Sequence, residues 1–425
     1  MADAAALCAA GAEKAVSNEL RKLGLSVAGS AYGRVRFKAG LSGLYRALMG
    51  LRAADRVLLE TACFPAVDFD ALFEGTREVP WEAYIPRGMG LRVSKVRTNR
   101  SRLMAETSIQ AVVHKAAAGR LCERLHLARL PEAEKQAELR VYIEKDRVSL
   151  LLDLSGPPLF KRGYRLEGGA APLRESTAAA LLLLANWRRK YPLWDPLCGS
   201  GTIAIEAALY AWDMAPGLGR TFALQDMLPA DPALEQRIRE ELLAKVNLDR
   251  TIRIHGSDED KSVLAIAKAN LLRAYDLARG KRLSPEKRRR RESGAGGPLP
   301  LDLGPPLDAP GLPELRAAAM EDSAGWPPCE ERPLSPQNPD EESGRDEPAG
   351  FIITNPPYGI RLGDAAGAEA VYRKMAGLTR RFPGWKLAVI TGHPGFESHF
   401  GRKADSRREI TNGAIHSYIY QYEQL

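Results

Sequence analysis

The sequence predicts an α/β protein in which a mostly parallel sheet wrapped by helices follows two smaller α+β segments. Two observations indicate this class. After residue 165, apolar strand-like runs alternate with long helical runs, whereas shorter strands and helices mix before it. In addition, 45% of the 425 residues are hydrophobic, which is enough for more than one core.

The N-terminal half is predicted to be α+β. Helices are expected at 13–23, 41–49 and 107–124, and strands at 33–37, 57–61 and 91–96. Two further strands, 138–143 and 148–153, flank a turn-like spacer and predict a hairpin. The alanine-rich run that starts at Ala4 is predicted to be helical, because Asp3 replaces the positive start that a signal peptide needs.

The C-terminal half is predicted to alternate strand and helix. Strands are expected at 193–195, 252–258, 351–354, 386–391 and 414–420, and helices at 173–187, 203–212, 233–248, 261–275 and 369–382. A ligand of such a sheet binds beyond the carboxyl ends of its strands. Residues 279–349 interrupt the alternation with consecutive arginines and a proline-rich, acidic run. They are predicted to be a disordered insertion, apart from a strand-like segment at 315–322.

The composition predicts a soluble protein that binds a polyanion. The formal net charge is +8, which attracts nucleic acid at low salt. The five cysteines are scattered without a CxxC pair, so reduced thiols and a cytoplasmic location are expected. The six histidines show no ligand spacing, and no apolar stretch approaches the roughly 18 residues of a membrane span, so neither metal nor membrane is expected. The oligomeric state is left open.

A glycine loop is the first candidate site. Residues 195–202 read Asp-Pro-Leu-Cys-Gly-Ser-Gly-Thr between an apolar strand and a helix. Gly199 and Gly201 allow a tight turn against a ligand, and the N–H groups of the helix start favour a carboxylate. The pattern also fits the dinucleotide motif G-x-G-x-x-A, so it does not select a cofactor by itself. Asp258, at the end of the next strand, is the candidate for binding ribose hydroxyls; the alternative is a helix cap before Lys261.

A proline corner is the second candidate site. Residues 355–358 read Asn-Pro-Pro-Tyr after another apolar strand. The amine of a nucleobase is a poor nucleophile, and two acceptors aimed at its N–H bonds pull the nitrogen toward tetrahedral geometry. Asn355 offers a side-chain oxygen, and the stiff corner of Pro356 and Pro357 offers a carbonyl. Tyr358 offers a flat face for a base turned out of its stack. These four residues are assigned as catalytic; the alternative is an ordinary Pro-Pro turn.

Together, residues 195–208 and 353–363 resemble the THUMP-containing bacterial RNA guanine-N2 methyltransferases of the large-subunit ribosomal RNA type. Some members of this family are described as N6-adenine-specific DNA methylases. The likeness extends to residues 51–57, 72–75, 155–156, 159–165 and 171–175. The resemblance implies a ferredoxin-like segment at 1–65, a THUMP RNA-binding domain at 66–165, and one Rossmann-like class I methyltransferase domain at 166–425, which contains the insertion at 279–349.

The resemblance also implies the chemistry. The expected cofactor is S-adenosyl-L-methionine, and the matching positions are Asp195, Cys198, Gly199, Gly201, Thr202, Asp258, Pro172, Glu175 and Asp322. The expected reaction is methylation of a guanine N2 in ribosomal RNA of the 23S type. Two rivals stay open: an N6-adenine DNA methyltransferase, which shares the proline corner, and a non-catalytic RNA-binding assembly factor.

A basic segment is the candidate RNA contact. Between positions 87 and 102 the chain carries cations and no acidic residue, which suits phosphate tracking. A solvated strand and loop is the alternative. The residues assigned to RNA binding are Arg92, Lys95, Arg97, Arg100 and Arg102, with Lys161, Arg162 and Arg165 added near the domain junction.

Overall fold

The computed structural model describes residues 1–165, 173–280, 311–321, 347–359, 365–413 and 415–425. The chain forms two compact units. Unit 1 comprises Met1–Cys8, Ser17–Leu159 and Arg220–Glu240, and unit 2 comprises Ala9–Val16, Phe160–Gly219 and Glu241–Leu425. Each unit contains one seven-stranded sheet.

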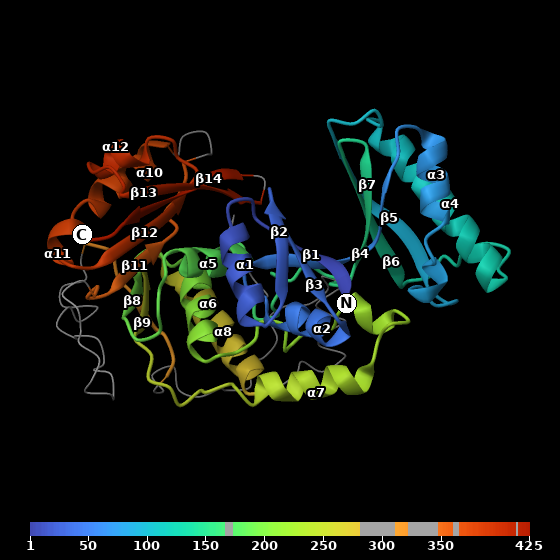
Figure 1. The fold of residues 1–425 in the computed structure, drawn as a ribbon. Coiled ribbons are helices and arrows are strands. Elements are labelled where there is room, and N and C mark those ends of the chain that lie inside the picture. The colour runs from blue at the N-terminus through green and yellow to red at the C-terminus, as the bar shows by residue number, and fades with distance from the viewer. Residues whose placement is uncertain (166–172, 281–310, 322–346, 360–364, 414) are drawn as a thin grey trace. The chain divides into compact units, whose positions relative to one another are not determined.

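The sheet of unit 1 has the strand order β2-β3-β1-β4-β7-β6-β5 (Figure 1). Its neighbours are antiparallel except β5 and β6, which are parallel. The long strand β4 pairs with β1 through its first half and with β7 through its second half. The strands are β1 (Ala2–Cys8), β2 (Ser26–Ala31), β3 (Arg34–Ala39), β4 (Ala54–Pro65), β5 (Gly90–Asn99), β6 (Gln136–Glu144) and β7 (Arg147–Asp153).

The helices of the N-terminal half cover this sheet. Helix α4 packs against β5 and against α3, and Leu139, Val141 and Ile143 of β6 are buried in that half of the unit (Figure 1). The helices are α1 (Glu13–Lys22), α2 (Leu41–Gly50), α3 (Phe69–Arg77) and α4 (Glu106–Leu125), with short 3-10 turns η1 (Trp81–Ala83) and η2 (Ala223–Asp226).

The helical prediction for the alanine-rich run is wrong, because that run is strand β1. Ala4, Ala5 and Ala6 are buried, and β1 pairs with β3 on one side and β4 on the other. These two ladders outweigh the helix propensity of alanine. Strand β2 was not predicted. The hairpin prediction is confirmed: Lys145 and Asp146, between β6 and β7, both have positive φ, as a tight hairpin turn requires.

The sheet of unit 2 has the order β10-β9-β8-β11-β12-β14-β13. The five strands from β10 to β12 are parallel, and β14 and β13 add an antiparallel edge. The order reverses between β8 and β11, where a doubly wound sheet binds its ligand. The strands are β8 (Leu193–Asp195), β9 (Ile254–Asp258), β10 (Glu314–Ala317), β11 (Phe351–Thr354), β12 (Lys386–Thr391), β13 (Ser406–Asn412) and β14 (Ile415–Tyr422).

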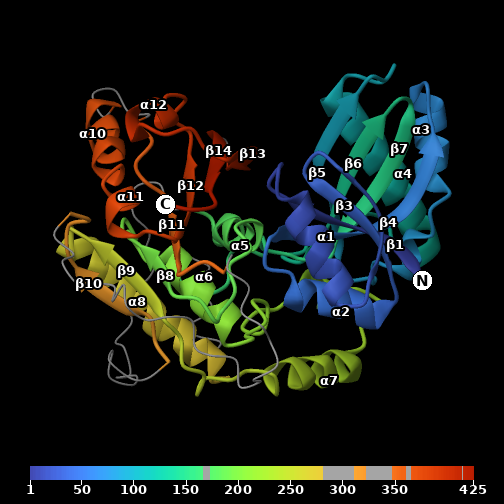
Figure 2. The same ribbon diagram turned by 60° about the vertical axis from the view of Figure 1, so that its left-hand side comes forward.

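Helices lie on both faces of this sheet, with α5, α6 and α8 on one side and α10, α11 and α12 on the other (Figure 2). The second side is rich in aromatic side chains, which include Trp194, Tyr372 and Trp385. The helices of unit 2 are α5 (Glu175–Leu184), α6 (Thr202–Ala211), α8 (Lys261–Ala278), α10 (Ala365–Met375), α11 (Leu378–Arg381) and α12 (Phe396–Phe400). Helix α7 (Pro232–Leu243) belongs mostly to unit 1. The mixed α/β class and the mostly parallel sheet are therefore as predicted.

The single helix predicted at 369–382 is wrong, because α10 and α11 are separated at Gly377, a residue that weakens a helix. The strand-like segment predicted at 315–322 overlaps β10 (Glu314–Ala317), but residue 322 and most of the predicted insertion lie outside the described residues. Within the described part of the chain, no helix has the length and apolarity needed to cross a membrane.

Candidate active site

The glycine loop and the proline corner begin side by side. Strands β8 and β11 are parallel neighbours, with Phe351 opposite Leu193 and Ile352 opposite Trp194. At their carboxyl ends the Thr354 hydroxyl donates a hydrogen bond of 2.7 Å to the Asp195 carboxylate. The two segments that sequence analysis selected thus emerge together where the strand order reverses.

Asp195 lies beneath the loop. It is 1% exposed, and it accepts hydrogen bonds from the Thr354 hydroxyl at 2.7 Å and the Leu197 backbone N–H at 3.3 Å. Burial raises its pKa to about 7, and the nearby Asp258 charge adds to this effect. These contacts make Asp195 a positioning residue that ties the loop to the corner; its direct contact with a cofactor stays a prediction.

Asp258 holds the other side of the loop. Its carboxylate accepts the Gly199 N–H at 2.9 Å and the Asp260 N–H at 3.0 Å. Asp258 is not the cap of α8. The N-cap is Asp260, whose side chain accepts hydrogen bonds from the N–H groups of Ser262 and Val263. A carboxylate has about four acceptor positions, so Asp258 retains capacity for the two hydroxyls of a ribose.

The glycines leave room for a nucleoside cofactor. Gly199 has φ +52°, and no atom of the described residues lies within 4 Å of the position that a β-carbon would take there. Gly201 has φ +80°, and a β-carbon would approach that of Ala267 to 3.1 Å. One glycine therefore opens a surface, and the other permits close packing of α6 on α8. Cys198 is 6% exposed, and burial raises its thiol pKa, so it is an inert part of the wall.

Thr202 and Glu175 are brought together by Arg165. The Arg165 guanidinium donates to the Thr202 hydroxyl at 2.5 Å and lies 3.6 Å from the Glu175 carboxylate. Burial raises the pKa of Glu175. Thr202 and Glu175 begin α6 and α5, so this arginine joins two helix starts. The other two predicted cofactor positions, Pro172 and Asp322, lie outside the described residues.

The proline corner is ordered by its own tyrosine. The Tyr358 hydroxyl donates to the Asn355 side-chain oxygen at 2.8 Å, and both side chains are half-buried. Gly392, after β12, faces the ring: a β-carbon there would lie 3.2 Å from Tyr358 Cδ2. Pro356 is buried, and Pro357 is exposed. Gly392 has no local motif around it in the sequence, so its place beside Tyr358 is evident only from the structure.

Tyr372 is a second residue that sequence analysis missed. Its hydroxyl donates to the Pro357 carbonyl at 2.6 Å and lies 3.1 Å from the Thr391 hydroxyl. Proline fixes φ but leaves ψ free, so the ring of Pro357 does not set the direction of its own carbonyl. Tyr372 sets that direction. The Pro357 carbonyl is thus engaged by a donor of the chain itself.

Two histidines stand behind the corner without forming a metal site. His399 and His393 lie 3.4 and 4.0 Å from the same Glu369 oxygen, and His393 accepts the Gly395 N–H. No group of three metal-ligating side chains with suitable geometry occurs among the described residues.

The predicted RNA contacts separate into two groups. Arg162 is a correction: it is 2% exposed and pairs with Glu206 at 3.4 Å, so it supports α6 from within and does not reach a phosphate. Arg165 contacts Thr202 and Glu175, so its guanidinium is also engaged within the chain. Lys161 is exposed. The cations of the basic segment, Arg92, Lys95, Arg97, Arg100 and Arg102, are all exposed, and their role in RNA binding stays a prediction.

Two family models match the chain. The model described as the RMKL-like methyltransferase domain matches residues 162–278 and 338–421, which include the glycine loop and the proline corner. The model described as the RlmL ferredoxin-like domain matches residues 3–58. The order of β1 to β4 in the sheet agrees with the second match.

Individual relatives agree with the models. YpsC of Bacillus subtilis, assigned as an RNA methyltransferase, is 32% identical over 97% of this chain and 93% of its own length. The ribosomal RNA large subunit methyltransferase K/L of Chromohalobacter salexigens is also 32% identical, but this chain spans only 50% of its length. The chain spans about half the length of the other K/L proteins that it matches.

Solved structures show the same likeness. SMU.472, described as a methyltransferase in complex with SAH, has 31% identity and a TM-score of 0.77, with 99% of this chain and 97% of that chain covered. A Listeria monocytogenes protein described as a predicted N6-adenine-specific DNA methylase has 33% identity and a TM-score of 0.78, with 99% and 96% covered. The chain therefore belongs to the RMKL-like methyltransferase family, and its N-terminal part is the RlmL ferredoxin-like domain.

Proposed function

We propose that this chain is an S-adenosyl-L-methionine-dependent RNA methyltransferase that methylates the exocyclic N2 of a guanine in large-subunit ribosomal RNA. The observation that carries the proposal is the hydrogen bond between Thr354 and Asp195, because it joins the cofactor loop to the amine-binding corner. RNA is favoured over DNA by the names of the K/L relatives and of YpsC. The choice of guanine N2 is an inference from the family.

The cofactor residues fit the donor. The open surface at Gly199 leaves room for the cofactor to lie against the backbone of the loop. The Asp258 carboxylate accepts hydrogen bonds from the ribose hydroxyls of the cofactor. When bound, the cofactor supplies an electrophilic methyl group on a sulfonium, so the protein needs neither a covalent nucleophile nor a metal. Alignment of donor and amine supplies the acceleration.

The corner binds the amine. The Asn355 oxygen and the Pro356 carbonyl accept the two N–H bonds of the base amine, and the Tyr358 ring lies against the base. In the free protein the Tyr358 hydroxyl donates to that same Asn355 oxygen, so the arriving amine replaces this internal donor. The half-buried corner limits competition from water for the Asn355 oxygen.

The domain assignment completes the proposal. We assign residues 1–65 to a ferredoxin-like segment, 66–165 to a THUMP RNA-binding domain, and 166–425 to the methyltransferase domain. The predicted boundary at residue 65 falls at the end of β4, the strand shared by both parts of the unit 1 sheet. An enzyme that acts on ribosomal RNA works in the cytoplasm, and we propose that location.

The test is methyl transfer from labelled S-adenosyl-L-methionine to two acceptors. Large-subunit ribosomal RNA from a strain that lacks this protein is compared with unmethylated DNA, and nuclease digestion identifies the methylated nucleoside. N2-methylguanosine in RNA is the expected product. N6-methyladenine in DNA would establish the rival enzyme activity, and cofactor binding without transfer to either acceptor would favour a non-catalytic assembly factor.

A further inference from the structure

A group of cations lies on one face of the unit 1 sheet. The side chains of Glu138, Arg140 and Tyr142 alternate along β6 with Leu139, Val141 and Ile143. Helix α4 packs on the side of the three apolar residues, so the polar residues point to the opposite face. Lys95 of β5 is opposite Arg140 in the register, and Asp153 of β7 is opposite Leu58 of β4 on the same face.

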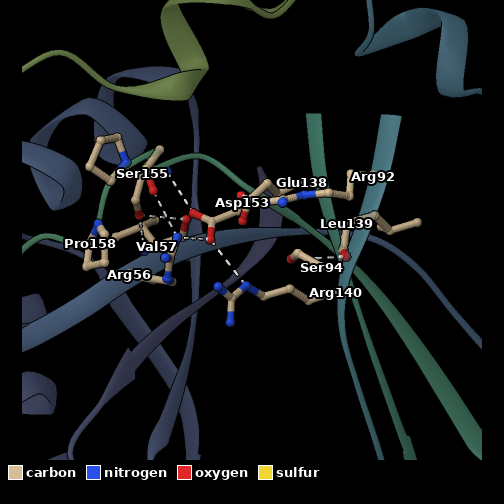
Figure 3. Close-up of polar contacts among 12 residues, drawn as sticks. Arg56, Val57, Arg92, Ser94, Glu138, Leu139, Arg140, Asp153, Ser155 and Pro158 are labelled. Atoms are coloured by element: carbon tan, nitrogen blue, oxygen red, sulfur yellow. Dashed lines mark hydrogen bonds and ion pairs between the residues drawn. The ribbon is translucent and has the colours of Figure 1, made fainter. Parts of the chain in front are cut away.

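Two arginines share one carboxylate at the centre of this face. Asp153 is 1% exposed, and its Oδ2 accepts from Arg56 at 2.5 Å and from Arg140 at 3.2 Å (Figure 3). Its Oδ1 accepts the Ser155 N–H at 3.0 Å. Asp153 thus accepts from three donors, two of which are guanidinium groups. One negative charge balances only one of the two guanidinium groups.

Arg140 retains unused donors. The residue is 91% buried (9% exposed), and only its Nε has a hydrogen-bond partner among the described residues. Figure 3 shows no dashed line at its two terminal nitrogens. The two terminal nitrogens reach solvent, so they can donate to an anion that approaches this face of the sheet.

Lys95 adds a further positive charge. It is exposed, and no acidic side chain of the described residues lies within ion-pair distance of its ammonium group. Burial of part of the side chain lowers the pKa of Lys95, and the positive charges of Arg97 and Arg140 lower it further. Other cations nearby are neutralised, because Arg92 pairs with Glu138 and Arg97 with Glu106. The register also places Glu60 of β4 on this face, where its carboxylate accepts from the Ser149 hydroxyl at 3.4 Å. Among the ion pairs of the described residues, Asp153 is the carboxylate that pairs with Arg56 and Arg140, and Lys95 has none.

We propose that Arg140 and Lys95, supported by Arg56 and Asp153, bind a phosphodiester group of the RNA substrate on this face of the sheet. The proposal rests on the proposed RNA methyltransferase function. The fork of Arg140 suits two phosphate oxygens, and the Lys95 ammonium supplies a second charge from the facing strand. Asp153 fixes the Arg140 plane through Nε, which leaves the terminal nitrogens for the phosphate.

A neighbouring pair extends the surface. The Arg34 guanidinium of β3 lies 5.2 Å from the ring centre of Tyr142, which follows Arg140 by two positions on the same face of β6. This stacking holds another cation toward the proposed phosphate path. Arg34, Arg56 and Arg140 are not in the basic segment between positions 87 and 102, so sequence analysis did not select them.

The test uses the full chain and unmodified large-subunit ribosomal RNA transcribed in vitro. Lys95→Gln, Arg140→Gln and the double variant are compared with Lys115→Gln, which removes an exposed lysine from α4 on the other side of the sheet. The double variant is expected to lose about tenfold in RNA affinity and to lower the salt dependence, d log K/d log [salt], by about 1. Lys115→Gln is expected to stay within about twofold of the wild type.

Two controls separate this inference from the proposed function and from damage to the fold. S-adenosyl-L-methionine affinity is expected to be unchanged in every variant, and Lys95→Gln is expected to keep or raise the melting temperature, because it removes a repelled charge. If the double variant binds RNA like Lys115→Gln while the wild type still methylates RNA, the phosphate site is wrong and the function stands. A different outcome is that about 10 mM inorganic phosphate raises the melting temperature of the wild type alone while RNA affinity is equal in all variants. The site would then bind a free anion, and the RNA assignment would be overturned.

Discussion

The hydroxyl of Tyr372 donates a hydrogen bond of 2.6 Å to the carbonyl of Pro357, from a helix that follows the proline corner in sequence. Tyr372 is fully buried, and Thr391 holds the same hydroxyl from the end of β12. The corner therefore owes its φ angles to proline and the direction of one carbonyl to Tyr372.

Tyr372→Phe is expected to lower kcat by about tenfold or more, because the Pro357–Tyr358 peptide loses the contact that orients it. The control is Tyr422→Phe, which removes another buried tyrosine hydroxyl bonded to a backbone carbonyl, that of Arg402 at 3.0 Å. Each variant is expected to lose about 1 kcal/mol of stability. Steady-state methylation and urea unfolding measure both effects; equal turnover in the two variants would refute the positioning role.

Asn355→Ala is expected to lower kcat by about 100-fold or more, because the corner loses the acceptor that its side chain offers to the amine. The affinity for S-adenosyl-L-methionine, measured by calorimetry, is expected to stay within about threefold of the wild type, because the proposed partner of Asn355 is the substrate amine and not the methyl donor. Asn355→Asp retains an acceptor oxygen and is expected to recover part of the rate. Near wild-type turnover in Asn355→Ala would remove this residue from the mechanism.

Asp258→Asn is expected to weaken S-adenosyl-L-methionine binding by about tenfold to 100-fold, because hydrogen bonds from ribose hydroxyls to a charged acceptor contribute about 1.5 to 3 kcal/mol. Asp260→Asn is the matched control, since asparagine caps a helix as well as aspartate does. Calorimetric titration of both variants compares them directly. Equal affinities would mean that Asp258 only shapes the loop through Gly199.

Gly199→Ala is expected to lose more than about tenfold in cofactor affinity, because the new β-carbon occupies the open surface beside the loop. Its positive φ adds about 1 kcal/mol of strain. Gly24→Ala carries the same strain, with φ +76° and no described atom within 4 Å of the β-carbon, and lies far from the loop in sequence. Similar melting temperatures with different cofactor affinities are the expected result; unchanged affinity in Gly199→Ala would place the cofactor elsewhere.

Asp195 is expected to make the free energy of unfolding depend on pH. Its pKa is raised from 3.8 to about 7 by burial, so the stability of the protonated form is present below pH 4 and is lost as the pH rises to 7. Asp195→Asn stays neutral and keeps an acceptor for Thr354. Its stability relative to the wild type is expected to rise across this window by about 1.4 kcal/mol per pH unit at most. Urea unfolding at several pH values measures this difference; parallel profiles would contradict the buried, protonated carboxyl.

Local patterns in the sequence determined much of this protein. The alternation of apolar runs indicates the strands of the parallel sheet, and the composition of residues 195–202 and 355–358 indicates a loop and a corner. These features depend on neighbours in the chain: glycine permits positive φ, proline fixes φ, and an apolar strand followed by polar residues marks a strand end.

Only the tertiary structure decided which distant residues meet. The alanines of β1 form a strand because β3 and β4 pair with them, and Arg162 is buried because Glu206 lies opposite it. The same holds for Thr354 on Asp195, Tyr372 on Pro357, and Arg140 beside Lys95. Each contact depends on strand order and helix packing, which are set by the burial of apolar surface over the whole domain. A polar side chain gives no local sign of the partner that folding will bring to it.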